Sequence, residues 1–371
     1  MKVIIAAGGT GGHINPAISI ANKIKIENPK AQILFIGTEK GLEKDLVPRA
    51  GYILQLIRVE GFSRKISLNN IRKIFKVFLG SKDSKKIIKD FEPDIVIGTG
   101  GYVCGPVLMQ ATKNHIPTVL HESNALPGIT TKLLASKVDK VLVGFDETKE
   151  FLKKAKNIVT TGNPVRIKKK KLSPDEKEKI LLDFGLKNSK PIILVFGGSQ
   201  GARGINNAFV GILKRKLNTK YQIIFATGQK NYEPIKEELN KKNIDIENLD
   251  GVKVLPYIYN MEEVMNIADL LVCRGGAMTL SEIMIMGKPS ILIPLPTAAE
   301  NHQEYNARVL EKMGAAQVIL EKDLNADSLN QKIIEIVQDR ERIIKMCNQA
   351  KKLEIKNVED KIYIEIMGLI K

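Results

Sequence analysis

Short apolar runs recur along both halves of the chain, and stretches of mixed polarity separate most of them. Runs of this kind predict buried parallel strands, and mixed stretches such as residues 17–27 predict helices. The predicted strands are residues 3–7, 32–37, 95–98, 118–121 and 140–143 in the first half, and 192–196, 222–226, 253–255, 270–273 and 290–293 in the second. Alternating strands and helices predict an α/β fold with parallel sheets.

Glycine clusters follow the first apolar run of each half. Residues 8–12 read Gly-Gly-Thr-Gly-Gly and precede His13, and residues 197–201 read Gly-Gly-Ser-Gln-Gly. A buried strand that turns into a helix leaves free backbone N–H groups, which attract phosphate together with the helix dipole. Either cluster alone is equally typical of a tight turn. The pair with His13 favours a nucleotide-sugar site, and two copies predict two doubly wound domains that face a central cleft.

A linker is predicted where residues 162–174 combine two prolines with four consecutive lysines. We therefore expect an N-terminal domain over residues 1–163 and a C-terminal domain over residues 164–345. From about residue 327 the pattern is helical and rich in lysine. A final helix over residues 346–371 could pack on either domain.

Charge narrows the class of partner. Lys and Arg number 58 and Asp and Glu 41, so the net charge is +17, which favours an anionic partner. Aromatic residues make up only 5% of the chain and Trp is absent. The interleaving of aromatic and basic residues that single-stranded nucleic acid requires is not evident, and we expect no nucleic-acid partner.

Cysteine usage and hydropathy indicate the compartment. Cys104, Cys273 and Cys347 are far apart, so neither a disulfide framework nor a cysteine zinc site is expected. The first residues enter a strand without a signal-peptide pattern, and no apolar run reaches the roughly 18 residues of a transmembrane helix. We expect a cytoplasmic protein, with peripheral membrane contact still open.

His13 is the candidate general base. It lies beside a predicted helix start, and the positive end of a helix dipole favours the neutral imidazole that a base requires. The alternative is a histidine that only hydrogen-bonds the loop.

Three further residues have both a binding and a structural interpretation. Glu282 could accept two hydrogen bonds from a ribose diol, although Thr279-x-x-Glu282 is also a capping-box pattern, which the spacing alone favours. Arg166 could hold a diphosphate or be one more base beside the lysine run. Ser199 could bind a phosphate or cap a helix.

Several familiar site patterns are missing from the sequence. There is no Asp-x-Asp triplet for a metal-diphosphate clamp and no Walker A lysine, and the first loop lacks the third glycine of a dinucleotide fingerprint. Glu39, which follows the second predicted strand, is weak support for a dinucleotide-binding site. We expect neither a metal nor a cofactor.

Residues 71–79 have the periodicity of an amphipathic helix. The predicted apolar face is Ile71, Ile74, Phe75, Phe78 and Leu79, with Arg72, Lys73 and Lys76 around it. A basic amphipathic helix suits an anionic membrane surface. An ordinary domain helix with solvated lysines has the same pattern.

Five segments together resemble the MurG family of bacterial glycosyltransferases. They are residues 8–16, 121–124, 162–166, 197–203 and 274–282, which occur in the family's order along nearly the whole chain. The resemblance implies a GT-B fold of two Rossmann-like domains, with the active site in the cleft. It also implies that the first domain binds acceptor and membrane, that the second binds the UDP-sugar, and that the last helix packs back on the first.

The resemblance assigns a role to each matching residue. Thr10, Gly11, Gly12 and Asn124 would face the sugar and the acceptor, and Arg166, Ser199 and Ile258 would contact the nucleotide and diphosphate. The uridine and ribose would be held by Ala277, Met278, Thr279, Leu280, Ser281 and Glu282. Gln303 would contact the sugar, in a loop (residues 296–303) where the register could slip by one.

The implied reaction is an inverting transfer of N-acetylglucosamine from UDP-N-acetylglucosamine to lipid I, with His13 as base. It would give lipid II for peptidoglycan synthesis, cell shape and division. The implied location is peripheral, on the anionic cytoplasmic face of the inner membrane, with other cell-wall enzymes as candidate partners. Three alternatives stay open: a binding protein without turnover, a glycosyltransferase with another acceptor, and a UDP-sugar epimerase.

Overall fold

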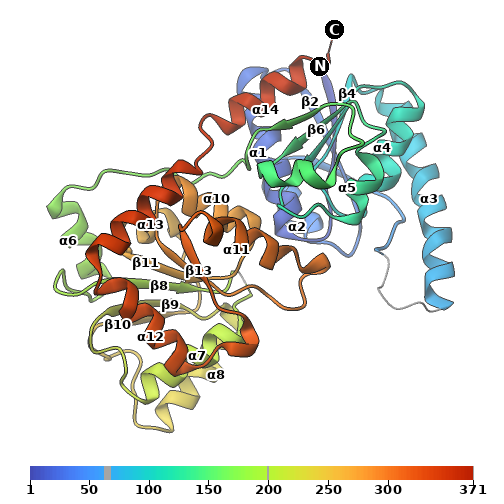
Figure 1. Cartoon of the computed structure of the whole chain (residues 1–371). Coiled ribbons are helices and arrows are strands. Elements are labelled where there is room, and N and C mark those ends of the chain that lie inside the picture. Colours follow the sequence, from blue (N-terminus) through green and yellow to red (C-terminus); the bar gives the residue numbers. More distant parts are fainter. Residues whose placement is uncertain (62–67, 199, 371) are drawn as a thin grey trace. The chain divides into compact units, whose positions relative to one another are not determined.

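The computed structural model describes residues 1–61, 68–198 and 200–370, and for residues 68–75 it describes the backbone only. The chain divides into two compact units (Figure 1). Unit 1 consists of Met1–Arg166 and Ile355–Lys371, and unit 2 consists of Ile167–Glu354.

Unit 1 is built on a seven-stranded parallel sheet in the order β3-β2-β1-β4-β5-β6-β7. Its strands are β1 (Lys2–Ala6), β2 (Gln32–Gly37), β3 (Ile53–Leu56), β4 (Ile95–Gly98), β5 (Thr118–Glu122), β6 (Lys140–Val143) and β7 (Ile158–Thr160). Its helices are α1 (Gly11–Glu27), α2 (Glu43–Arg49), α3 (Leu68–Phe91), α4 (Cys104–Lys113), α5 (Ile129–Leu134), the 3₁₀ helix η1 (Asp146–Phe151) and α14 (Val358–Met367).

The apolar runs of unit 1 exist because helices cover both faces of its sheet. Along β1, Val3 and Ile5 join the core beneath α1 and α14, whereas Ile4 and Ala6 join the core beneath α3, α4 and α5. Successive side chains of a strand point to opposite faces, so a strand covered on both sides must be apolar throughout.

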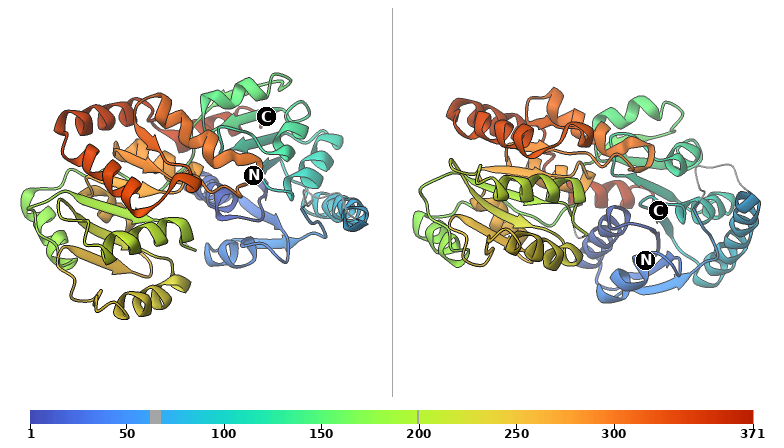
Figure 2. Two further views of the ribbon diagram at one scale, coloured as in Figure 1. Left: turned by 60° about the horizontal axis from the view of Figure 1, so that its bottom comes forward. Right: turned by 90° about the horizontal axis from the view of Figure 1, so that it is seen from below.

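Unit 2 repeats the design with a six-stranded parallel sheet in the order β10-β9-β8-β11-β12-β13, with helices on both sides (Figure 2). Its strands are β8 (Ile192–Phe196), β9 (Gln222–Ala226), β10 (Val252–Leu255), β11 (Leu270–Cys273), β12 (Ser290–Leu292) and β13 (Ala316–Val318). Its helices are α6 (Pro174–Asp183), α7 (Arg203–Lys214), α8 (Gln229–Asn240), α9 (Met261–Ile267), α10 (Ala277–Met286), α11 (His302–Lys312), α12 (Ala326–Val337) and α13 (Arg340–Lys352), with short 3₁₀ turns η2 (Ala299–Asn301) and η3 (Glu321–Asp323).

Both sheets reverse their strand order beside the strand that leads into a glycine loop. The reversal lies between β1 and β4 in unit 1 and between β8 and β11 in unit 2. At such a point the loops of neighbouring strands leave in opposite directions, and ligands of open α/β sheets bind there. The fold therefore favours ligand binding at the carboxyl ends of β1 and β8.

The structure contains all ten strands predicted from the sequence, and it adds β3, β7 and β13. Each of these three lies at a sheet edge. The alternation along β3 is weak, because two of its leucine and isoleucine side chains are exposed. Edge strands have fewer neighbours to bury them, so their apolar signal is short.

The chain passes between the units at other residues than the sequence suggests. It leaves unit 1 after Arg166, not after residue 163, and returns at Ile355, not at residue 346. Residues 346–354 stay with unit 2 because α13 packs on α10 and α12 and buries Met346 and Ala350.

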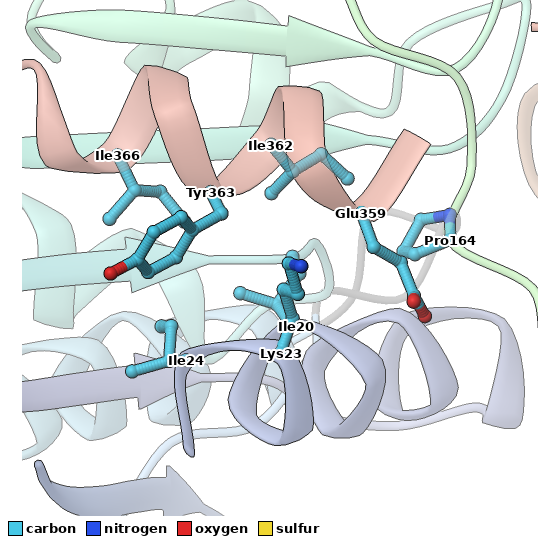
Figure 3. A pocket seen from close by; sticks show the side chains of 8 residues that line it. All are labelled: Ile20, Lys23, Ile24, Pro164, Glu359, Ile362, Tyr363 and Ile366. Carbon is cyan, nitrogen blue, oxygen red and sulfur yellow. The ribbon is translucent and has the colours of Figure 1, made fainter. Parts of the chain in front are cut away.

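Helix α14 packs on α1 within unit 1 (Figure 3). Ile362 and Ile366 are almost fully buried there, and the gap that remains between the two helices is narrow. Polar contacts flank this apolar seam: the hydroxyl of Ser19 donates to Glu359, and Lys23 forms an ion pair with Asp360. Asp360, together with Glu27 on the same helix as Lys23, raises the pKa of Lys23. The C-terminal segment is thus a structural part of unit 1.

We expect Ile366→Ala to lower the free energy of unfolding by about 2–5 kcal/mol, because it leaves a cavity in a closed seam. Ile364→Ala is the matched control, since Ile364 is 65% exposed on the same helix, and it should change stability by less than about 0.5 kcal/mol. Urea denaturation measures both. Equal losses in the two variants would contradict the packing of α14 described here.

Candidate functional site

The first glycine loop joins β1 to an uncapped helix. Helix α1 begins at Gly11 after Thr10, whose side chain makes no capping hydrogen bond, and its first turn holds no acidic residue. Gly9 has a φ of 94°, which only glycine adopts readily. The predicted residues Thr10, Gly11 and Gly12 therefore lie at an open helix N-terminus.

The imidazole of His13 lies against the backbone of this loop. Its Nδ1 is 3.1 Å from the carbonyl oxygen of Gly8. Because a carbonyl only accepts hydrogen bonds, the proton of the neutral ring belongs on Nδ1, which leaves the Nε2 lone pair available. The loop after β4 limits the ring from the other side, since a Cβ at Gly100 would lie 2.6 Å from its Cδ2 atom. The ring therefore has a defined orientation, and its Nε2 has no partner among the residues that the structure describes.

Asn124 follows β5 at the same edge of the sheet. The buried carboxylate of Glu122 accepts hydrogen bonds from both the backbone and the side-chain nitrogen of Asn124, each at 3.0 Å. Its other oxygen accepts from the Gly128 backbone N–H and the Thr131 hydroxyl. Glu122, to which the sequence analysis gave no role, orients the asparagine and joins it to the start of α5.

Glu43 is a second residue that no sequence pattern predicted. It is fully buried at the start of α2, and its carboxylate accepts the Gly9 N–H at 3.0 Å, together with the backbone N–H and hydroxyl of Thr38. A Cβ at Gly41 would lie 1.9 Å from the carboxylate. Gly37 and Gly41, two glycines shortly before this acid, are the sequence signal that could have identified it.

The second glycine loop joins β8 to α7. A Cβ at Gly201 would lie 2.0 Å from the Thr227 carbonyl oxygen, so the backbone there passes very close to the loop after β9. Helix α7 has no side-chain cap at Ala202 and no acid in its first turn. Its free N–H groups form a site that suits an anion. Ser199 lies outside the described residues.

Helix α10 decides between the two interpretations of Glu282. The helix begins at Ala277 after Gly276, so Thr279 lies inside it and is not its cap. The capping-box alternative is therefore wrong. Among the predicted residues of this helix, Ala277, Leu280 and Ser281 are buried, whereas Met278, Thr279 and Glu282 are partly exposed. Spacings of three and four residues place these last three side chains on one face.

The carboxylate of Glu282 has no partner among the described residues. It is half-buried, it makes no hydrogen bond or ion pair with them, and burial raises its pKa to about 7. A carboxylate taken out of water without donors is costly. A ligand that brings two hydroxyl donors would remove that cost, which is what a ribose diol offers.

The remaining predicted residues lie at separate points. The side chain of Gln303 accepts a hydrogen bond from the Leu295 N–H. Its backbone carbonyl oxygen lies close to Gly275, just before α10, where a Cβ would come within 2.4 Å of it. Ile258 is buried in the loop after β10. Arg166 is exposed and belongs to unit 1, where its charge opposes the rise that burial causes in the pKa of Tyr52. The structure thus brings Gln303 close to the start of α10 and leaves Arg166 in the other unit.

The described residues contain neither a metal site nor a membrane-spanning helix, and a pocket in unit 2 is lined by other residues than the predicted ones. No group of three or more His, Cys, Asp or Glu side chains among them could hold a metal ion, and none of their helices is both long and apolar enough to cross a bilayer. A pocket of about 290 Å³ in unit 2 is lined by Pro294, Pro296, Asn301, Glu304, Leu320, Glu321 and Lys322.

Comparisons with known proteins agree on one family. Residues 3–143 match the glycosyltransferase family 28 N-terminal domain, and residues 192–362 match its C-terminal domain. A relative from Caldanaerobacter subterraneus is 48% identical over 98% of both chains. It is named UDP-N-acetylglucosamine–N-acetylmuramyl-(pentapeptide) pyrophosphoryl-undecaprenol N-acetylglucosamine transferase.

Solved structures extend the likeness to the fold. The crystal structure of MurG from Acinetobacter baumannii has a TM-score of 0.78 at 26% identity and covers 99% of both chains. A putative UDP-N-acetylglucosamine 2-epimerase from Listeria monocytogenes has a TM-score of 0.67 at 12% identity, over 99% of this chain and 96% of its own, and shares the fold alone. The predicted GT-B class, with its two doubly wound units, is confirmed.

We expect Glu282→Gln to stabilise the unliganded protein in a pH-dependent way. Between about pH 4.5 and pH 7 the unfolded chain loses the Glu282 proton while the folded chain keeps it, so the wild type loses stability as pH rises. Glutamine cannot ionise, and its advantage should grow to about 1–3 kcal/mol at pH 8. Thermal unfolding at pH 4.5 and pH 8 measures the difference.

Glu237→Gln is the control for this prediction, because Glu237 is an exposed acid on α8 of the same unit. It should give no pH-dependent gain. A gain for Glu282→Gln that is equal at both pH values would contradict a carboxylate that is buried without partners.

Proposed function

The chain belongs to the MurG family within glycosyltransferase family 28, and we propose that it transfers N-acetylglucosamine from UDP-N-acetylglucosamine to lipid I. The acceptor group is the C4 hydroxyl of the muramic acid, and the product is lipid II, the precursor of peptidoglycan. The enzyme is thus a hexosyltransferase. The alternatives of a binding protein without turnover and of an epimerase have no support beyond the shared fold.

The orientation of His13 is the observation that carries the chemistry. Its Nδ1 faces the Gly8 carbonyl, and Nε2 has no partner among the described residues. A general base needs such a free nitrogen at a polar, accessible position. His13 takes the proton of the acceptor hydroxyl through Nε2, and Asn124, fixed by Glu122, positions the acceptor sugar beside it.

Unit 2 supplies the donor half of the reaction. The face of Met278, Thr279 and Glu282 holds the uridine and ribose, with the Glu282 carboxylate on the ribose hydroxyls. Gln303 contacts the sugar and Ile258 the nucleotide. The uncapped N-terminus of α7 accepts the diphosphate. Ser199 and Arg166 complete the contacts to the nucleotide and diphosphate.

The transfer inverts the anomeric centre, because the acceptor oxygen attacks from the face opposite to UDP. The hydroxyl oxygen forms a bond to the anomeric carbon while the bond to the diphosphate oxygen breaks, and the proton passes to His13. The transition state resembles an oxocarbenium ion. Negative charge develops on UDP, so a helix N-terminus and a guanidinium stabilise it more than a proton donor would.

A lipid acceptor requires the enzyme to work at the cytoplasmic face of the inner membrane, and α3 offers a suitable surface. Side chains of residues 71–75, most of the predicted apolar face, lie outside the described residues. Of the described ones, Phe78 is 67% exposed, whereas Leu79 is half-buried and Lys76 pairs with Glu60. Exposed lysines continue the face of Phe78 at Lys82, Lys85 and Lys89. This basic face docks on anionic lipid, where other cell-wall enzymes are candidate partners.

The base is tested by His13→Ala, which should lower transfer of labelled N-acetylglucosamine to lipid I by about 10²–10⁴-fold. UDP at about 100 times its dissociation constant should still add roughly 2.7 kcal/mol of stability, because none of the proposed nucleotide contacts involves His13. His115→Asn is the control: His115 is exposed with a φ of 55°, which asparagine tolerates. Near-normal transfer by the His13 variant would remove this residue from the mechanism.

The membrane surface is tested by sedimentation with anionic vesicles. Phe78→Ser should weaken binding, and Lys82→Gln with Lys85→Gln should weaken it by about fivefold for each lysine, less at high salt. Leu182→Ser is the matched control, because Leu182 is 66% exposed on α6 of unit 2. If the α3 variants sediment like the wild type while folded, the enzyme docks through another surface.

A further inference from the structure

We propose that Glu43 is a positioning residue that acts on His13 through the peptide group between Gly8 and Gly9. This inference rests on the proposed function, in which His13 is the base. It adds a second residue that orients and polarises that base. The carboxylate does not touch a substrate. It acts on the imidazole through one intervening amide, which places it behind the base on the side away from Nε2.

The geometry consists of two hydrogen bonds on one peptide group. The N–H of Gly9 donates to Oε2 of Glu43 at 3.0 Å, and the carbonyl oxygen of Gly8 lies 3.1 Å from Nδ1 of His13. Gly8 C=O and Gly9 N–H belong to the same planar amide, whose electrons are delocalised. A carboxylate, an amide and an imidazole are therefore linked in one chain of hydrogen bonds.

Polarisation along this chain favours a stronger base. A negative charge at the amide hydrogen shifts electron density towards the amide oxygen, which makes the Gly8 carbonyl a better acceptor. The better acceptor holds the proton on Nδ1 and stabilises the imidazolium that forms when Nε2 takes a proton. During the transfer the substrate proton moves to Nε2, and His13 keeps its Nδ1 proton.

The peptide group has no room to rotate out of this chain. A Cβ at Gly8 would lie 2.4 Å from a methyl carbon of Val103, and a Cβ at Gly101 would lie 2.3 Å from the Gly8 oxygen. Glycine at both positions lets neighbouring segments close on the amide from two sides. The link between carboxylate and imidazole is therefore held rigidly.

The side chain of Glu43 is buried where taking a carboxylate out of water has a cost. Its side chain is fully buried, and no cation among the described residues forms an ion pair with it. Its Oε1 accepts the N–H and hydroxyl of Thr38, so only Oε2 is left for Gly9. A neutral amide has only one acceptor oxygen, so it could not accept from both Thr38 and Gly9 in this arrangement. A buried charge aimed at this one peptide fits a role in the electrostatics of His13.

Two substitutions separate the relay from simple support of the loop. In Glu43→Gln the amide oxygen can still accept from Thr38, but the NH₂ group faces the Gly9 N–H and the charge is gone. Thr38→Val removes a hydrogen bond from the same carboxylate and keeps its charge and its bond to Gly9. Both variants disturb the same buried cluster, so Thr38→Val is the matched control.

We expect Glu43→Gln to lower kcat by about 10–100-fold with little change in the KM for UDP-N-acetylglucosamine. The acid limb of its kcat/KM profile should move to lower pH, because the imidazolium loses a stabilising charge. Thr38→Val should keep kcat within about threefold, and Glu43→Asp, which restores the charge, should recover part of the activity. Nitrogen NMR of histidine-labelled protein should find the His13 proton on Nδ1 in the wild type, and less so in Glu43→Gln.

Each outcome either supports or overturns the relay. A wild-type His13 with its proton on Nε2 overturns it even if Glu43→Gln fails to fold. Equal losses of kcat in Glu43→Gln and Thr38→Val, with the tautomer and the pH profile unchanged, show that Glu43 only supports the loop. Failure of the proposed base looks different: His13→Ala would then keep its turnover, whereas the tautomer would still follow Glu43.

Discussion

Close backbone approach at the strand-to-helix turns is the constraint on which the whole arrangement depends. A Cβ at Gly101 would overlap the Gly8 carbonyl, and one at Gly197 would lie 2.3 Å from the backbone nitrogen of Ala202. Only residues without a Cβ let these loops fold tightly enough to leave the first turns of α1 and α7 open. The glycines thus fix where a helix begins, and the free N–H groups follow from that position.

Glu43, Glu122 and Glu282 are carboxylates at or near the proposed binding residues. Their hydrogen-bond partners distinguish a structural role from a ligand-binding role. Glu43 and Glu122 are buried and accept hydrogen bonds from several neighbours, so the fold itself satisfies them. Glu282 has no such partners in the part of the chain that the structure describes, and burial raises its pKa to about 7. A protein retains a carboxylate in an unfavourable place when a ligand completes it.

The sequence predicted the parts of the structure that interact mainly with their own neighbours along the chain. Local patterns were enough to predict the ten inner or strongly apolar strands, both glycine loops and the position of His13. The edge strands β3, β7 and β13 were not, since little of their surface is buried. Glu43 was missed because its partner, Gly9, is 34 residues away, and α13 was divided wrongly because Met346 is buried by tertiary packing rather than by its own periodicity.

Two loops with one sequence pattern have different surroundings. Beneath the first loop the Gly9 N–H is bound to the buried Glu43 carboxylate, so one of its backbone donors is already used. Neither α1 nor α7 has an acid in its first turn, and Glu321, which approaches Gly204 beside the second loop, is paired with Arg274. The net positive end of α7 remains for an anion. The two loops share a local sequence pattern, and what separates them is the Glu43 carboxylate beneath the first, a partner 34 residues from Gly9 that the pattern alone does not reveal.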